Sequence, residues 1–184
     1  MDFRCRMKKF IQIATLVFTV LTALFSVLYL NFNTELYITL AVTFGTTLYH
    51  FAMRLVVGVF VPRSFKYTDK FFTEKPFEKN LYKFLKVKKW KRFMPSYNPA
   101  SYSLENNSNT LEKVANTTCR NEVIHLVICL FSFVPVFFSK FFGAEAVFII
   151  TSVLSCLFDM IFVVMQRYNR PRLVKIINRK NNRF

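Results

Sequence analysis

The sequence predicts an all-α integral membrane protein with four transmembrane helices, a cytoplasmic interfacial amphipathic helix and both termini in the cytoplasm. Of its 184 residues, 53% are apolar and 18% are aromatic, which exceeds the apolar share of an ordinary soluble domain. Four apolar runs reach the roughly 20 residues that a helix needs to cross a hydrocarbon core about 30 Å thick. They lie at about 10–30, 36–61, 123–142 and 144–165. We expect them to form a single membrane domain over residues 1–184.

The basic residues are unevenly distributed, and this predicts the orientation of the helices. The formal net charge is +16, and Lys and Arg gather before the first apolar run, in the loop at 63–121 and after the fourth run. The only charged residue in the connection after the first run is Glu35, and the charged residues in the connection after the third run are Lys140 and Glu145. An excess of Lys and Arg marks cytoplasmic segments, so both termini and the central loop should face the cytoplasm. This charge suits anionic lipid head groups and not nucleic acid, because the aromatic residues follow the membrane runs.

Other classes of protein lack their sequence signatures here. Only three glycines occur and no glycine-rich phosphate loop is present, so a nucleotide-binding fold is not indicated. The four cysteines show no spacing typical of a disulfide or zinc framework. The first apolar run is too long for a signal peptide and no small-residue cleavage site follows it, so we expect an uncleaved anchor.

The second apolar run carries two ionisable residues in its inner third. His50 and Arg54 stand four apart and share one helix face. A histidine in hydrocarbon requires a partner, which an interhelical hydrogen bond would supply. Arg54 either extends to the cytoplasmic head groups or faces the helix bundle. The first run has few polar residues, so its expected role is packing.

The central loop, residues 63–121, contains an expected amphipathic helix over 76–92. Its apolar residues recur at i, i+4, i+7 and i+8, while lysines occupy the other faces. Pro76 is a favourable first helical residue, and Trp90 suits the head-group layer. Such a helix lies in the membrane interface, where apolar burial and lysine attraction to anionic lipid add together. The apolar positions are Phe77, Leu81, Phe84 and Leu85.

The third helix is expected to begin before the membrane and to become polar at the membrane entrance. Glu122 and His125 stand three apart, so they share one helix face there. A histidine beside a carboxylate can act as a general base, because the carboxylate orients the ring and supports its charged form. The alternative is a polar helix end that only anchors the helix. Pro135 should kink the outer half.

The fourth helix carries Asp159 at a depth similar to that of His50, where a carboxylate needs a partner. The available partners are His50, Arg54 and His125. If the helices pack antiparallel, these groups and the polar residues after 165 gather in one layer at the inner leaflet. Glu-x-x-His occurs once, whereas di-iron carboxylate sites need it twice, so we expect no metal and no cofactor. A single-metal site of His50, Glu122, His125 and Asp159 is the alternative.

Three segments resemble a known family in their residues and order. They are Val87 to Lys91, Cys119 to His125 and Gln166 to Leu173, and they resemble the glycosyl-4,4'-diaponeurosporenoate acyltransferases, enzymes of the staphyloxanthin pathway. The resemblance implies a multi-pass protein of a bacterial cell membrane that transfers a fatty acyl group to a sugar hydroxyl of a glycosylated carotenoid. Leu126 follows His125 where the family often has Trp, which leaves another lipid-linked sugar or alcohol open as acceptor.

We therefore expect a membrane O-acyltransferase acting on a glycosylated lipid at the cytoplasmic face. His125 is the expected base and Glu122 its orienting partner, although His50 stays open as the base. The expected partners are membrane lipids, the glycosylated acceptor, and acyl carrier protein or acyl-CoA as donor. The alternative is a non-enzymatic lipid-binding or assembly protein with a buried polar network. The expected substrate-binding residues are Asn169, Arg170, Arg172, Arg167, Gln166, His50, Arg54, Trp90 and Asp159.

Overall fold

The computed structural model describes residues 3–91 and 108–182, and this part of the chain forms helices and no strands. Four segments within it are long and apolar enough to cross a membrane: Lys9–Phe32, Glu35–Phe60, Leu111–Phe142 and Glu145–Asn181. The predicted all-α fold with four helices of membrane length is therefore confirmed. The orientation of the termini stays a prediction.

The chain divides into two compact units, and the division falls within two of the long helices. The first unit contains residues 1–60 and 127–159, and the second contains residues 61–126 and 160–184. We describe each unit in turn.

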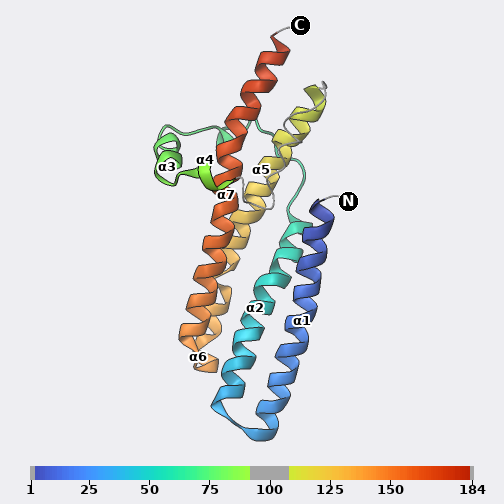
Figure 1. The fold of residues 1–184 in the computed structure, drawn as a ribbon, viewed down its shortest axis with the longest axis vertical. Coiled ribbons are helices and arrows are strands. Elements are labelled where there is room, and N and C mark those ends of the chain that lie inside the picture. The colour runs from blue at the N-terminus through green and yellow to red at the C-terminus, as the bar shows by residue number, and fades with distance from the viewer. Residues whose placement is uncertain (1–2, 92–107, 183–184) are drawn as a thin grey trace. The chain divides into compact units, whose positions relative to one another are not determined.

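The first unit begins with a hairpin of two long helices, α1 (Phe3–Phe32) and α2 (Glu35–Phe60), which run side by side in opposite directions (Figure 1). Asn33 makes the turn with a φ of 47°, a left-handed conformation that asparagine tolerates better than most residues. Its amide donates to the carbonyl of Tyr29 at 2.7 Å. The hydrogen bond satisfies one of the carbonyls that a helix end leaves open.

Aromatic rings hold α1 against α2. Phe18 stacks on Phe51 with ring centroids 5.5 Å apart, and Phe25 stacks on Phe44 at 5.4 Å. None of the α1 side chains that the structure describes is buried. Most of the surface of α1 is thus apolar and open, which suits contact with lipid chains.

The predicted helix over 123–142 is interrupted in the first unit. Helix α5 (Ser108–Phe131) ends early, and the 3-10 helix η4 (Val134–Phe138) and the short α6 (Ser139–Phe142) follow. Pro135 explains the break, because a proline has no amide hydrogen and its ring clashes with the carbonyl four residues earlier, that of Phe131. Tyr49 on α2 donates its hydroxyl to this carbonyl at 2.9 Å. The sequence predicted a kink at Pro135. The helix is instead interrupted near this residue, because α5 ends at Phe131 and Pro135 lies in η4.

Small side chains let the end of α5 approach the beginning of α7 (Glu145–Asn181). The hydroxyls of Ser132 and Ser155 lie 3.1 Å apart, and the Cys129 thiol lies 3.4 Å from the carbonyl of Cys156. Small residues with hydrogen-bonding groups are typical of contacts between membrane helices. This contact joins residues 127–159 of the first unit to each other.

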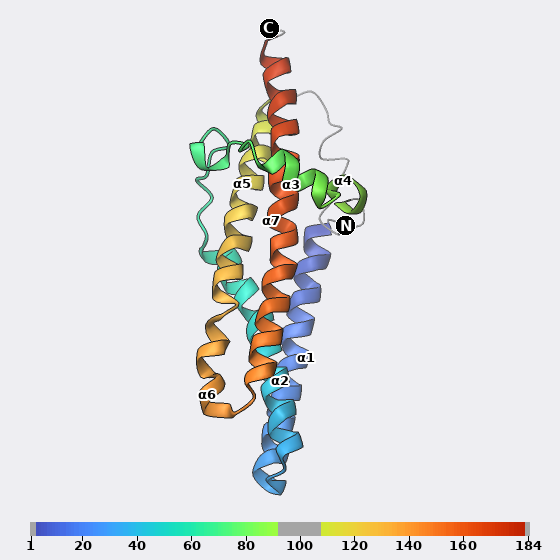
Figure 2. The same cartoon turned by 90° about the vertical axis from the view of Figure 1, so that its left-hand side faces the viewer.

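The second unit is built on the remaining parts of α5 and α7. Leu111 and Ala115 on α5 form a core cluster with Leu173 and Ile177 on α7. In each pair the residues stand four apart, so they share one helix face. The unit also contains the 3-10 helix η1 (Lys70–Phe72) and two short helices, α3 (Glu78–Phe84) and α4 (Val87–Trp90). Figure 2 shows α3 and α4 beside α7.

The amphipathic helix predicted over 76–92 is two helices, α3 and α4. Lys86 separates them in a left-handed conformation with φ 49° and ψ 37°. Tyr82 and Val87 are both buried, yet residues five apart lie on different faces of one continuous helix. The break at Lys86 lets both side chains turn inward. The predicted end at Arg92 lies outside the described residues, and the position of these helices at a membrane interface stays a prediction.

The predicted end of the fourth helix at 165 was too early, because α7 continues to Asn181. Pro171 lies inside this helix and does not end it. Leu173 and Ile177 are both buried against α5. Packing of this apolar face against α5 stabilises the helix beyond residue 165. The apolar run that marks the membrane segment in the sequence ends earlier, so it does not show this extension.

Candidate functional site

A network of ionised side chains occupies the centre of the second unit. Glu122 on α5 is 0% exposed. Its carboxylate accepts hydrogen bonds from Arg167 Nε at 2.7 Å and from Arg170 Nη2 at 2.5 Å. Arg167 also pairs with Glu78 on α3 through Nη1. The two arginines stand three apart on α7 and reach the same carboxylate because they share a helix face. Two guanidinium groups are thereby balanced by two carboxylates.

The same arginines hold the loop before α3. Arg167 Nη2 donates to the carbonyl of Phe71 at 2.9 Å, and Arg170 Nη1 donates to the carbonyl of Phe72 at 3.2 Å. Arg170 Nε also donates to the hydroxyl of Thr118 at 3.1 Å. The planar guanidinium group can make several such bonds at once. The network therefore joins η1, α3, α5 and α7.

A second set of contacts joins α3 and α4 to α7. Lys91 Nζ, just after α4, donates to the Asn169 side-chain oxygen at 3.1 Å and lies 4.9 Å from the ring centre of Tyr168. Tyr82 on α3 meets the Tyr168 ring edge-on at 5.3 Å and donates its hydroxyl to Glu78 at 2.8 Å. Burial, with the hydrogen bond to Glu78 and the charge of that carboxylate, raises the pKa of Tyr82. The phenol is therefore a proton donor at neutral pH.

His125 lies one helical turn after Glu122 on α5. Its ring stacks on Phe162 of α7, with centroids 4.8 Å apart and planes 12° apart. The side chain is half-buried. Both oxygens of Glu122 accept from arginines, and the orientation of His125 by Glu122 stays a prediction.

The other predicted site residues of this unit differ in burial. Trp90 donates its indole N–H to the carbonyl of Leu85 at 2.9 Å. Arg172 is exposed, donates to the Tyr168 hydroxyl at 2.5 Å and lies over the Tyr168 ring. Gln166 is buried. The Tyr168 ring lies beside both Lys91 and Arg172.

The first unit contains a simpler charged group. Arg54 on α2 pairs with Asp159 on α7, and its Nη2 also donates to the Ser155 hydroxyl at 2.9 Å. Arg54 Nη1 donates to the carbonyl of His50 at 2.6 Å. Of the three partners that the sequence offered for Asp159, the structure pairs it with Arg54. The guanidinium group thus faces another helix of its unit.

His50 is 5% exposed, and neither ring nitrogen forms a hydrogen bond with a residue that the structure describes. Its ring meets the edge of Tyr49 at 5.5 Å. A buried polar group without a partner costs about 1–3 kcal/mol. His50 is therefore the predicted site residue whose polar atoms are least satisfied within the described chain.

The predicted site residues thus fall into two clusters, one in each unit, and their gathering in one layer stays a prediction. Sequence reasoning missed Glu78, Tyr82, Lys91 and Tyr168. One signal for Glu78 was available, since it is the only acidic residue between Lys75 and Lys91. Among the residues that the structure describes, no three His, Cys, Asp or Glu side chains are placed to hold a metal ion.

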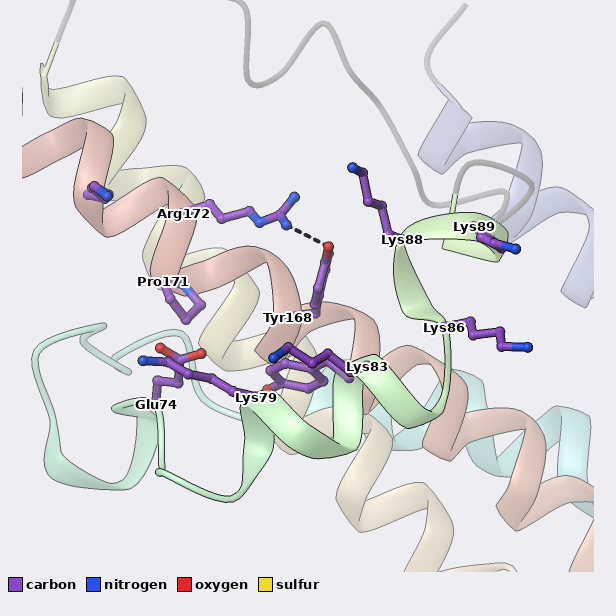
Figure 3. A pocket seen from close by; sticks show the side chains of 11 residues that line it. Glu74, Lys79, Lys83, Lys86, Lys88, Lys89, Tyr168, Pro171 and Arg172 are labelled. Carbon is purple, nitrogen blue, oxygen red and sulfur yellow. Dashed lines mark hydrogen bonds between the residues drawn. The ribbon is translucent and has the colours of Figure 1, made fainter.

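Each unit also contains a cavity. In the first, an apolar groove of about 490 Å³ is lined by residues of α1, α2, η4, α6 and α7. In the second, a cavity of about 690 Å³ opens between α3, α4 and α7 and is lined mainly by lysines (Figure 3). Both volumes lie in the range of ligand-binding pockets. The second cavity is lined by Glu74, Lys79, Tyr82, Lys83, Lys86, Lys88, Lys89, Tyr168, Pro171, Arg172 and Lys175.

Comparison with known proteins identifies one family. The family model described as glycosyl-4,4'-diaponeurosporenoate acyltransferase matches residues 68–179, more than half of the chain. The match includes η1, α3, α4, the ion-pair network and the lysine-lined cavity. No curated protein and no solved structure matches the chain.

Proposed function

Because the chain belongs to the glycosyl-4,4'-diaponeurosporenoate acyltransferase family, we propose that it is a membrane O-acyltransferase. It transfers a fatty acyl group to a sugar hydroxyl of a glycosylated lipid at the cytoplasmic face of a bacterial cell membrane. The family match over residues 68–179 carries this proposal. A glycosylated carotenoid is the acceptor that the family description names, and another lipid-linked sugar is the alternative.

The reaction needs a base to remove the hydroxyl proton. As the hydroxyl oxygen attacks the acyl carbon, a C–O bond forms and the bond from the acyl carbon to the donor's leaving group breaks. The base takes the hydroxyl proton and returns it to the leaving group. The chain has two histidines, and His125 lies within the matched residues whereas His50 lies outside them. We therefore assign the base to His125.

Glu122 supports this role in two ways. It lies one turn before His125 on α5 and shares its helix face. Its bonds to Arg167 and Arg170 also hold the helix that carries the ring. The stacking of His125 on Phe162 limits the rotation of the imidazole. Substrate contacts by Gln166, Asn169 and Trp90 of the same unit are part of the same proposal.

The test is lipid mass spectrometry of the native host with and without the gene. We expect a lipid heavier by one fatty acyl unit to disappear in the deletion strain and to return with the wild-type gene. His125→Ala should lower its formation roughly 100-fold or more, the usual contribution of a general base, at unchanged membrane abundance. His50→Ala is the matched variant and should restore the lipid. The reverse result would assign the base to His50.

The second candidate is a non-enzymatic lipid-binding or assembly protein. The balanced charges of Glu78, Glu122, Arg167 and Arg170 favour it, because a closed network needs no substrate to complete it. On this alternative, the lipid profile is unchanged by the deletion under every growth condition. His125→Ala would then lower the abundance of the protein, if it has any effect.

A further inference from the structure

Seven of the eleven residues that line the lysine-lined cavity of the second unit are basic. Lys79 and Lys83 come from α3, and Lys88 and Lys89 from α4. Lys86 from the break between these helices and Arg172 and Lys175 from α7 complete the basic lining, and Glu74 is the only acidic side chain among the lining residues. Figure 3 shows the side chains that line the cavity, with Lys88 and Arg172 near the Tyr168 hydroxyl. The cavity therefore carries a strongly positive potential.

Among the residues that the structure describes, the six lysines of the cavity have no anionic partner. None of the six lysine side chains forms a hydrogen bond or an ion pair with a residue that the structure describes. By contrast, Arg167 and Arg170 of the same unit are paired with Glu78 and Glu122. Like charges held around one opening repel each other, and a bound anion relieves this repulsion. The lysines of this cavity, and not the paired arginines Arg167 and Arg170, are thus placed to bind an anionic ligand.

The helix is broken at Lys86, between α3 and α4. Lys86 adopts a left-handed conformation, which is strained for a residue with a side chain and is found at ligand-binding sites more often than elsewhere. Along one continuous helix the lysines at 79, 83, 86, 88 and 89 would spread over several faces. After the break, Lys88 of α4 points toward Arg172, whereas Lys86 and Lys89 point away from Tyr168 (Figure 3).

We propose that this cavity binds the phosphate groups of a phosphorylated acyl donor of the coenzyme A type. Lysine ammonium groups are common partners of phosphate, and a cavity of about 690 Å³ has the size of a small-molecule site. A cavity encloses a nucleotide better than it accommodates the convex surface of an acidic carrier protein. The inference rests on the proposed acyltransferase function, whose donor it names.

The test is binding of coenzyme A to the full-length protein in nanodiscs of zwitterionic lipid, measured by calorimetry without an acceptor. Coenzyme A should bind more tightly than dephospho-coenzyme A, and pantetheine, which has no phosphate, should show no binding. Affinity should fall steeply with salt. Lys83→Gln with Lys88→Gln should weaken binding of coenzyme A at least about tenfold, because two charge-assisted contacts are lost. Lys66→Gln with Lys113→Gln removes two lysines outside the cavity lining and should leave the affinity unchanged.

Three results would overturn the proposal. Equal effects of the two double variants would indicate general charge attraction. Binding of phosphatidylglycerol vesicles but not coenzyme A, lost in the cavity variant, would indicate a lipid head-group site. Binding of an acidic acyl carrier protein without coenzyme A would indicate a protein donor. The His125→Ala variant should still bind coenzyme A, because His125 does not line the cavity. The binding measurement therefore tests the donor site separately from the assignment of His125 as the base.

Discussion

Each compact unit buries one group of charged side chains, and the two groups are built differently. In the first, Arg54 and Asp159 form a single ion pair between two helices. In the second, two arginines share Glu122, and one of them also binds Glu78. The first group joins α2 to α7, whereas the second joins four segments of the chain and includes backbone carbonyls of η1.

The difference follows from the surroundings of each group. Long apolar helices already hold the first unit together, so one pair satisfies the few charges that they carry. The second unit has a small apolar core of Leu111, Ala115, Leu173 and Ile177. Its loop and short helices bury Phe72, Tyr82 and Val87 but carry many charged and exposed residues between them. The network ties these segments to α5 and α7, so its loss should matter more than loss of the pair.

The largest expected effect is that of Glu122→Ala. It leaves Arg170 buried without a carboxylate and Arg167 with Glu78 alone, a defect that costs about 3–5 kcal/mol. Membrane abundance and the unfolding temperature of the detergent-solubilised protein should both fall. Glu112→Ala removes a carboxylate from the same helix and is the control. Equal destabilisation by the two variants would refute a special role for the network.

The next effect is that of Asp159→Ala, for which we expect a loss of about 2 kcal/mol. It is smaller because Arg54 is 14% exposed and keeps its hydrogen bond to Ser155. The double variant Arg54→Met with Asp159→Leu should regain most of the lost stability, since apolar residues can replace a buried pair. The same thermal unfolding measurement checks this.

The corresponding exchange in the network sharpens the comparison. Glu122→Leu with Arg170→Met should stay destabilised, because Arg167 keeps only Glu78 as a carboxylate partner. A recovery as large as that of the Arg54 and Asp159 double variant would mean that the two groups of charges behave alike. The two double variants should be compared in one detergent, so that only the local environment differs.

The smallest effect is a pH dependence at Tyr82. Because the folded state raises the pKa of this phenol, its contribution is fully present below the unfolded pKa of about 10 and is lost as the pH rises beyond it. Tyr82→Phe should cost about 1 kcal/mol at pH 8. The difference in unfolding free energy from the wild type should shrink at pH 10.5. A difference that is constant across this range would contradict the role of the Tyr82 hydrogen bond.

Length and apolarity predicted the four long helices, because these properties decide membrane insertion locally. They could not predict where α7 ends, since the apolar residues of 173–177 form a run far too short to cross a membrane, with basic residues on both sides, and Leu173 and Ile177 gain their burial from α5. The broken amphipathic helix has the same explanation. Val87 fits the lysine-rich helical pattern, and only its burial in the folded chain requires the turn at Lys86.

The candidate site was predictable where its residues are close in sequence or share a motif. Glu122 and the arginines of α7 were singled out together, and the structure joins them. Glu78 was missed because it lies 89 positions from Arg167, and no local rule links such residues. The split of the charges into two clusters is likewise a property of the folded chain.

Pro171 lowers the bending stiffness of α7 at one point along its length. A helix resists bending through its ladder of backbone hydrogen bonds, and proline removes one rung. The missing rung would have ended on the carbonyl of Arg167, four residues earlier. The side chain of that arginine binds Glu122, Glu78 and the carbonyl of Phe71. The stiffness of α7 at this point is therefore supplied from outside the helix, by side chains and loop carbonyls that brace it.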